Sequence, residues 1–326
     1  MFFWANRSSS PRTTSINSTS EDVNLPRFVV APALAVLLLA CLGSRAEPAG
    51  SSEADRLFLD NGSVRLGVKR SSGAAIFWFS AGGSERNVIN HWDRGRLLQQ
   101  SYYGAPDGSM WDRQPWRWNP VQGGDWKGNP ATVLELRRTA TSLYARSRAR
   151  HWASGIELTN VVLEEWITLA GRVARVRFQM TYGGQESHPA MDHEIPAVFV
   201  APAFETLVVY DGGAPWTHGA LSRSRPGWPN EGRSMAENWA AYVDSSGHGM
   251  GVWVPMATRL TCYRFGEGRE DHGACSYFAP LTRFAITPGT VFRYEAHLTL
   301  GTVGEIRERF YRLHRDASSN PHPPAK

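Results

Sequence analysis

Carboxylic acids stand at the beginnings of two predicted strands. Glu194 directly follows His193 in the first of them, and Glu237 precedes the second. A carboxylate beside a histidine can perform general acid–base chemistry, and a pair of Asp or Glu residues is what glycoside hydrolysis requires. We therefore predict Glu194 as the acid or base, with Glu237 or Asp125 as its partner. If the reaction is an elimination, His193 or Tyr103 would act instead. The alternative, that these carboxylates are only solvated charges at strand ends, stays open.

Residues 91–126 combine aromatic and hydrogen-bonding side chains in a long segment broken by Gly and Pro. Pyranose rings have an apolar face that stacks on aromatic side chains, and their hydroxyl groups bind amide, carboxylate and guanidinium groups. We therefore predict a sugar-binding site, in which Arg94, Arg175 or Arg177 would hold the carboxylate of an acidic sugar. The predicted stacking residues are Tyr102, Tyr103, Trp118 and Trp239, and the predicted hydroxyl-binding residues are Gln99, Gln100, Asn119, Gln122 and Asn238. The alternative is that the tryptophans only fill the core of a loop.

Glu165 lies on a predicted strand face that is otherwise apolar, between Leu163 and Ile167. A carboxylate in such a place must be paired, neutral or in a cleft. We predict an ion pair with Arg175 or Arg177 of the neighbouring strand.

Several other chemistries have no support in the sequence. It contains no Gly-rich phosphate loop, no His-x-x-x-His pair and no Gly-x-Ser-x-Gly motif, so that we predict neither a cofactor nor a metal site. The formal charge is +5, but the basic residues are dispersed and form no Lys/Arg block. Nucleic acid is therefore not an expected partner.

Alternating sequences predict the strands that hold these residues. In residues 142–152, Tyr144 and Arg146 share one face and Leu143 and Ala145 share the other. Residues 156–169 and 172–182 alternate in the same way. Such strands recur along the chain and predict an all-β fold, a large antiparallel β-sandwich. One closing helix is expected after residue 302, where a Thr and a Glu three residues later match a capping box.

The N-terminal residues 1–46 are predicted to direct export. A polar stretch is followed by Arg27 and by an apolar run from Phe28 to Leu42, which ends in small residues. This order is typical of a signal peptide and predicts an extracytoplasmic protein, secreted or periplasmic. Cleavage before Glu47, lipidation of Cys41 as a lipoprotein and an uncleaved anchor are the three alternatives. We then expect a linker at 47–55, a β-sandwich domain at 56–315 and a disordered tail at 316–326.

Cys262 and Cys275 flank a short polar segment. In an oxidising compartment two such cysteines can join neighbouring strands, so we predict a disulfide. A metal site is less favoured, because the nearby His272 would complete only three ligands with mismatched spacing.

Two motifs carry a resemblance to known proteins. They are QQSYYG at residues 99–104 and WRWNPVQGG at residues 116–124. With the triplet Glu237-Asn238-Trp239, they resemble a group of secreted bacterial proteins that are sometimes joined to lectin-like modules. The strand order is similar to the galactose-mutarotase-like supersandwich that epimerases share with many polysaccharide lyases and hydrolases. The resemblance implies a carbohydrate-active β-sandwich, and it transfers no catalytic residue.

These features predict an extracytoplasmic enzyme that cleaves a polysaccharide, as a glycoside hydrolase or a polysaccharide lyase. The alternative is a non-catalytic glycan-binding or cell-surface domain, which would use the same aromatic residues without an acid–base pair. A third interpretation is a mutarotase-type epimerase, which would need a pocket for a free sugar rather than an open groove.

Overall fold

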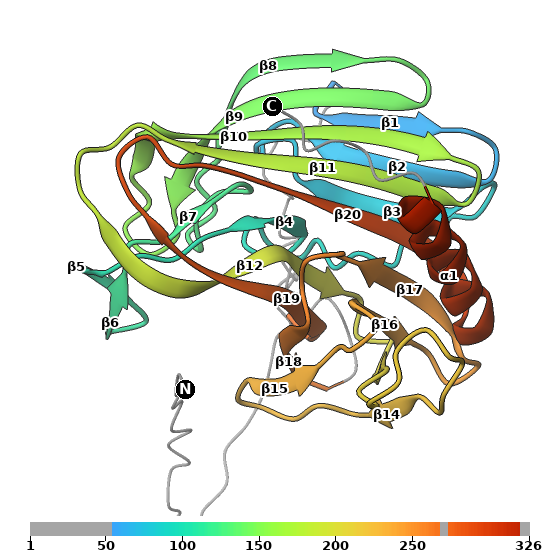
Figure 1. Ribbon diagram of the computed structural model, residues 1–326. Helices are drawn as coiled ribbons and strands as arrows, with labels where there is room; N and C mark the ends of the chain where they lie inside the picture. The colour runs from blue at the N-terminus through green and yellow to red at the C-terminus, as the bar shows by residue number, and fades with distance from the viewer. Residues whose placement is uncertain (1–53, 268–272, 320–326) are drawn as a thin grey trace, which may run out of the picture. The chain divides into compact units, whose positions relative to one another are not determined.

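The strands that the sequence predicts are present, and their side chains alternate between buried and exposed. The computed structural model describes residues 54–267 and 273–319, and most of them lie in antiparallel strands (Figure 1). On β11 (Val173–Tyr182) the side chains of Val176 and Phe178 are buried, and those of Arg175 and Arg177 are exposed on the other face. The same alternation holds on β9 (Ser142–His151) and along much of β10 (Glu157–Ala170). The predicted faces of these three strands are confirmed.

The strands form two paired series that are joined at β7 (Pro120–Val121), which pairs with both β4 and β9. The first series runs, in order of pairing, through β8 (Thr132–Arg138), β9, β10, β11, β20 (Val291–Thr302), β17 (His248–Trp253), β16 (Trp239–Val243), β13 (Thr206–Val209) and β14 (Ser222–Ser224). The second runs through β1 (Arg56–Asp60), β2 (Val64–Lys69), β3 (Ile76–Ala81), β4 (Leu98–Ser101), β12 (His188–Val200), β19 (Cys275–Ile286), β18 (Arg259–Phe265) and β15 (Glu231–Ser234).

Strands of the first series form an upper layer and strands of the second series form a lower layer, and the core lies between the two layers. Figure 1 shows β8–β11 and β20 above β4, β12 and β19. Val176 and Phe178 from the upper layer belong to the same buried cluster as Ile195 and Val198 from the lower one. The prediction of a large antiparallel β-sandwich is confirmed. A separate two-stranded ribbon, β5 (Pro106–Trp111) with β6 (Gln114–Arg117), extends from the lower layer.

The single helix of the described residues, α1 (Val303–Ser319), begins at the predicted capping box. The backbone N–H of Thr302 donates to the Glu305 carboxylate (2.9 Å), and the N–H of Glu305 donates to the Thr302 hydroxyl (3.3 Å). Ile306 and Phe310 are buried against β16 and β17. The helix continues through Ser319, so its last turn occupies the first part of the segment that was expected to be a disordered tail.

The predicted disulfide is wrong. In the register of β18 and β19, Cys262 lies opposite Phe278 and Cys275 lies opposite Phe265. The two cysteines are thus three residues apart along the ladder, about 10 Å, and they point to opposite faces of the sheet. A disulfide needs Cα atoms within about 7 Å. Both thiols are free and buried.

We expect both thiols to be unreactive in the folded protein, because burial raises the pKa of Cys262 to about 12 and that of Cys275 to about 11. Thiol titration of the chain from Glu47 onward, performed without reductant, should give little reaction before unfolding. After unfolding in guanidinium it should give both thiols. A titration that finds none after unfolding would restore the disulfide.

The predicted signal peptide, the lipidation site Cys41 and the linker up to residue 53 lie outside the described residues. Within the described ranges, no helix is long and apolar enough to cross a membrane.

Candidate functional site

Glu194 lies on the face of β12 that points away from the core. Its neighbour His193 points inward and is fully buried, whereas Glu194 is partly exposed. The register places Glu194 opposite Ser101 on β4 and opposite Leu281 on β19. Irregularities in both ladders follow Glu194, so that β12 bends where this carboxylate is presented.

Two tyrosine hydroxyls hold the Glu194 carboxylate. The hydroxyl of Tyr103 donates to Oε1 at 2.8 Å, and the hydroxyl of Tyr277 donates to the same oxygen at 2.6 Å. Both tyrosines leave Oε2 for the Ser101 side chain or for a ligand. Burial raises the pKa of Glu194, and hydrogen bonds from Tyr277, Tyr103 and Ser101 offset part of this effect. The carboxyl group is therefore suited to exchange protons closer to neutrality than an ordinary glutamate.

Aromatic rings continue from this carboxylate across β19 and β18. The ring of Tyr277 lies 4.6 Å from that of Phe199 and 4.5 Å from that of Tyr263. Tyr263 contacts Trp228 at 4.8 Å, and Trp228 contacts Phe265 at 5.2 Å. Phe265 is exposed, Tyr277 is buried, and Phe199, Tyr263 and Trp228 are partly exposed. We call these five residues the aromatic row.

Arg117 brings a positive charge to the same face. Its guanidinium carbon lies 5.8 Å from the ring centre of Tyr103, and it comes from the end of β6. Burial raises the pKa of Tyr103 well above its ordinary value, and the negative charge of Glu194 raises it further. Tyr103 therefore keeps its proton and acts as a donor.

The QQSYYG motif divides between two faces of the lower layer. Ser101 and Tyr103 reach the face of Glu194, whereas Gln100 and Tyr102 point into the core. Gln99 is on the outward side but is covered by a loop: its amide donates to the carbonyls of Gly95 (2.6 Å) and Arg96 (2.8 Å). The motif therefore provides internal structural contacts as well as residues on the face of Glu194.

The predicted hydroxyl-binding amides are not available to a ligand. Four of them, Gln99, Gln100, Asn119 and Gln122, are at most 2% exposed. Gln100 accepts from the Tyr102 hydroxyl (2.9 Å), Asn119 donates to the carbonyl of Tyr102 (2.7 Å), and Gln122 donates to the carbonyl of Gly73 (3.1 Å). Because buried amides must be paired, these side chains stabilise the loops around β4. The sugar-binding prediction for them is corrected.

Three predicted stacking residues and two predicted polar residues also have structural roles. Tyr102 is fully buried, Trp118 stacks on His188 in the interior (4.0 Å), and Trp239 is buried beneath α1. The amide of Asn238 donates to the carbonyl of Ala257 (2.9 Å). Arg94 donates to the carbonyl of Gly128 (2.8 Å) and to two serine hydroxyls, so it is not placed to hold a sugar carboxylate.

The predicted partners of Glu194 are elsewhere. Glu237 is fully buried in an ion pair with Arg307 of α1 (2.8 Å). Asp125 is fully buried and accepts hydrogen bonds from the backbone (2.8 Å) and side chain (2.6 Å) of Asn129, closing a loop. Neither residue contacts Glu194 or its tyrosines. Their prediction as catalytic partners is corrected, because both carboxylates are saturated by internal donors.

His193 is a neutral structural residue. Its Nδ1 accepts from the backbone N–H of Tyr103 (3.1 Å), so Nε2 carries the hydrogen that is donated to the carbonyl of Phe284 (3.0 Å). Burial lowers its pKa to about 4. Both ring nitrogens are occupied, and His193 cannot serve as the base. It fixes the backbone of Tyr103 instead.

The arginine pairing predicted for Glu165 is wrong. Arg175 pairs with Glu295 at 2.6 Å, and the guanidinium of Arg177 lies over the ring of Trp166. Both arginines are on the outer face of the upper layer, whereas Glu165 points into the core, where neither of its oxygens has a hydrogen-bond partner.

Of the predicted site residues, the structure brings Glu194 and Tyr103 together. Tyr277, Arg117 and the rest of the aromatic row complete the site. Sequence reasoning missed these last residues. Tyr277 lies in a segment that is buried on both faces, and nothing local shows that it meets a residue 83 positions earlier. Among the described residues no group of His, Cys, Asp and Glu is arranged to hold a metal ion.

Comparisons with known proteins define the class of fold. No protein-family model matches the chain, and no curated protein matches it in sequence. Solved structures with a galactose mutarotase-like fold do match. A galactose mutarotase-like protein from Lactobacillus casei superposes with a TM-score of 0.53 at 9% identity, over 76% of this chain and 100% of that one. A protein from Escherichia coli K12 described as a candidate aldose 1-epimerase superposes with a TM-score of 0.50 at 13% identity, over 76% of this chain and 99% of that one. The likeness shows the fold.

Proposed function

We propose that the protein is an exported carbohydrate-active enzyme that cleaves an acidic polysaccharide by elimination at Glu194. The observation that carries the proposal is the hydrogen-bonded pair of Glu194 and Tyr103 on a face lined by aromatic rings. The aromatic row offers several successive stacking positions, which suits a polymer better than a single sugar. The names of the matching folds, an aldose 1-epimerase and a galactose mutarotase-like protein, agree with chemistry on a sugar.

Elimination is favoured over hydrolysis by the number of carboxylates. Two-carboxylate hydrolysis needs a second Asp or Glu about 5–10 Å from the first. The candidate on the same face of β12, Asp192 two residues earlier, is bound by the guanidinium of Arg259 (2.9 Å), which lowers the pKa of its carboxyl group and leaves Glu194 as the available carboxylate. A single carboxylate next to a tyrosine is sufficient for an elimination.

The proposed reaction uses this pair as base and acid. Oε2 of Glu194 takes the proton from the carbon next to the uronate carboxyl group, and the electrons of that C–H bond form a C=C bond as the glycosidic C–O bond breaks. The hydroxyl of Tyr103 gives its proton to the leaving oxygen. The protonated Glu194 carboxyl group, whose Oε1 lies 2.8 Å from the Tyr103 oxygen, then turns and returns the proton to that oxygen. Arg117 would bind the uronate carboxylate.

We expect Glu194→Gln and Tyr103→Phe each to lower turnover by about 100-fold or more, because each removes a proton-transfer group. Activity on a panel of soluble polysaccharides would be followed by reducing-end release and by the absorbance of unsaturated uronate products. Asp192→Asn is the matched control, since Asp192 precedes Glu194 by two residues on β12 but pairs with Arg259. It should retain activity.

Other outcomes would replace the proposal. Reducing ends without unsaturated product would indicate hydrolysis. Retardation in affinity electrophoresis without any product would indicate a non-catalytic glycan-binding domain, the second candidate, which the same aromatic row supports. Faster equilibration of a free aldose, lost in Glu194→Gln, would indicate an epimerase.

A further inference from the structure

The outer face of the upper layer carries a second group of aromatic and charged side chains. The register of β8–β11 places Arg137 opposite Tyr144, Tyr144 opposite Trp166, and Trp166 opposite Arg177. The contacts follow this register. Tyr144 and Trp166 lie 5.2 Å apart between ring centres, and the guanidinium carbons of Arg137 and Arg177 lie 5.6 and 5.4 Å from the neighbouring ring centres. We call these four residues the cross-strand row.

Three arginines on this face, one of them Arg177 of the row, form no ion pair with a carboxylate among the described residues. Arg146 and Arg177 are exposed on β9 and β11, and Arg293 is exposed on β20. Glutamates lie opposite two of these arginines, but each is bound by another side chain. Glu135 and Glu295, opposite Arg146 and Arg177, pair with Arg137 and Arg175, and Glu164, also opposite Arg146, is bound by the hydroxyl of Tyr144 (2.7 Å) and by the amide of Gln179 (2.7 Å). Arg293 donates to the carbonyl oxygen of the same Gln179 amide (2.7 Å).

The other arginines of this face differ from these three. Arg137, Arg148 and Arg175 each pair with a glutamate, namely Glu135, Glu157 and Glu295. Cross-strand aromatic pairs and ion pairs of this kind stabilise a sheet. The three further arginines exceed the glutamates that are free to pair with them, and this excess of positive charge does not stabilise the sheet. Their presence points to a ligand that brings negative charge.

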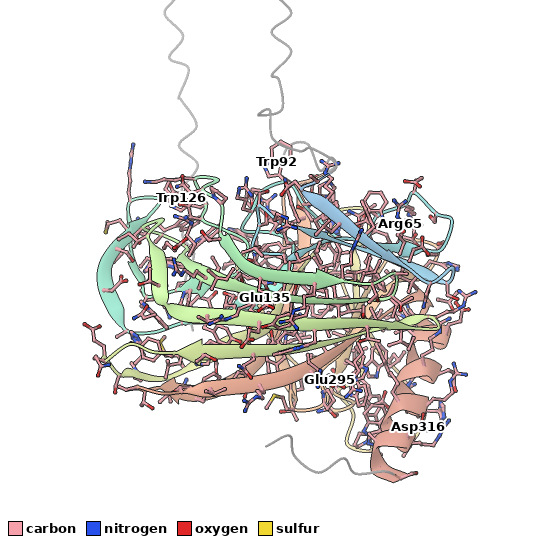
Figure 2. The ribbon with its side chains drawn as sticks, turned by 90° about the horizontal axis from the view of Figure 1, so that it is seen from above. Arg65, Trp92, Trp126, Glu135, Glu295 and Asp316 are labelled. Carbon is pink, nitrogen blue, oxygen red and sulfur yellow. The ribbon has the colours of Figure 1, made fainter. Side chains whose placement is uncertain are left out.

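This face is open. In Figure 2, which views the molecule from above, β8–β11 run uncovered across the surface, and Glu135 and Glu295 lie on it. It belongs to the upper layer and faces away from the core, whereas Glu194 lies on the outward face of β12 in the lower layer. A ligand here would therefore not compete directly for Glu194.

We propose that this face binds an acidic polysaccharide. The carboxylate or sulfate groups of the polymer bind Arg146, Arg177 and Arg293, and the apolar face of a sugar ring packs on Tyr144 and Trp166. Single-stranded nucleic acid fits less well, because it carries one phosphate per nucleotide and the glutamates interspersed on this face would repel so dense a charge.

The test is affinity electrophoresis of the full chain in gels that contain polygalacturonate, alginate or chondroitin sulfate. Fully methyl-esterified pectin serves as the uncharged probe. The variant R146Q/R177Q/R293Q should weaken binding by at least roughly tenfold, which corresponds to the loss of one charge-assisted hydrogen bond. It should also reduce the dependence of binding on salt. The control variant R148Q/R175Q removes arginines of the same face that are paired with glutamates, and it should weaken binding much less.

Each contrary result is decisive. No retardation by any of the three acidic polymers overturns the proposal, as does equal retardation by the esterified pectin. Stronger binding of oligo-deoxythymidine would assign the face to nucleic acid. Unchanged binding in the triple variant, with loss in Arg117→Gln, would place the acidic polymer at Glu194 alone. Thermal unfolding of the triple variant confirms that it is folded.

Discussion

Replacing Glu237 with alanine should lower the free energy of unfolding by about 3–5 kcal/mol, because it leaves a buried arginine without its partner. The Glu237 carboxylate is fully buried and accepts five hydrogen bonds. Arg307 donates two of them, at 2.8 and 3.2 Å, and the hydroxyl of Tyr311 donates one at 2.6 Å. The others come from the Trp239 indole (2.9 Å) and the backbone of Trp216 (3.0 Å). Burial by itself raises the pKa of Glu237, but these donors outweigh it and hold the pKa below its usual range.

Urea unfolding at pH 7 measures this effect. The control is Tyr311→Phe, which removes one donor and keeps the ion pair, and which should cost only about 1 kcal/mol. If Glu237→Ala lowers the free energy of unfolding by less than Tyr311→Phe does, the ion pair does not hold α1 against the strands. Such a result would also reopen a functional role for this carboxylate.

Replacing Glu165 with glutamine should remove much of the pH dependence of stability between about pH 4.5 and pH 8. Glu165 is 1% exposed, and both of its oxygens are buried without a hydrogen-bond partner. Burial raises its pKa to about 8 from an ordinary value of 4.5, and the neighbouring Gln122 side chain opposes this only in part. The folded protein therefore keeps the proton that the unfolded chain releases.

The sign of the effect follows from this difference. Between about pH 4.5 and pH 8 the unfolded chain binds fewer protons at this position than the folded protein does. Stability therefore falls as the pH rises through this window, by about 1.4 kcal/mol per pH unit, and it levels off above pH 8. Glu165→Gln cannot ionise, so it should resemble the wild type near pH 5 and be more stable near pH 8.

Urea unfolding of both proteins across this pH range gives the test. Glu164→Gln is the control, since its side chain is on the opposite face of the same strand and binds Tyr144 and Gln179. This variant should keep the wild-type slope. Curves for Glu165→Gln and the wild type that run parallel from pH 5 to pH 8 would contradict the buried, protonated state.

The fold was largely predictable because its signals are local. Alternation in residues 142–182 identifies the buried faces of β9–β11, and the Thr302–Glu305 box identifies the start of α1. The strand β19 is harder to see, since its first half is buried on both faces and does not alternate. The disulfide error has the same origin. Spacing along the chain does not reveal that Cys262 and Cys275 fall on opposite faces, which depends on the register of β18 and β19.

The site was less predictable because its contacts are long-range. Glu194 and Glu237 have similar sequence surroundings, each beside a polar residue and near the start of an apolar strand. Their different roles depend on distant partners. Arg307, 70 residues beyond Glu237, neutralises that carboxylate, whereas Glu194 meets two tyrosines and no cation within hydrogen-bond distance among its described partners. Likewise, the amides near residue 100 resemble sugar ligands in sequence, and only the fold shows that they are buried.

The division of the QQSYYG motif between two faces has a consequence for which property of the protein each mutation in the motif affects. Mutations at neighbouring positions should have different effects. Changes at the buried Gln100 and Tyr102 should mainly lower the amount of folded protein, whereas, under the proposed function, changes at Ser101 and Tyr103 should mainly lower binding or turnover. A large library of variants, sorted once for abundance and once for binding or turnover, should separate adjacent residues of this motif into two groups. Tolerance to mutation would then alternate with the pleat of the sheet rather than change gradually along the motif.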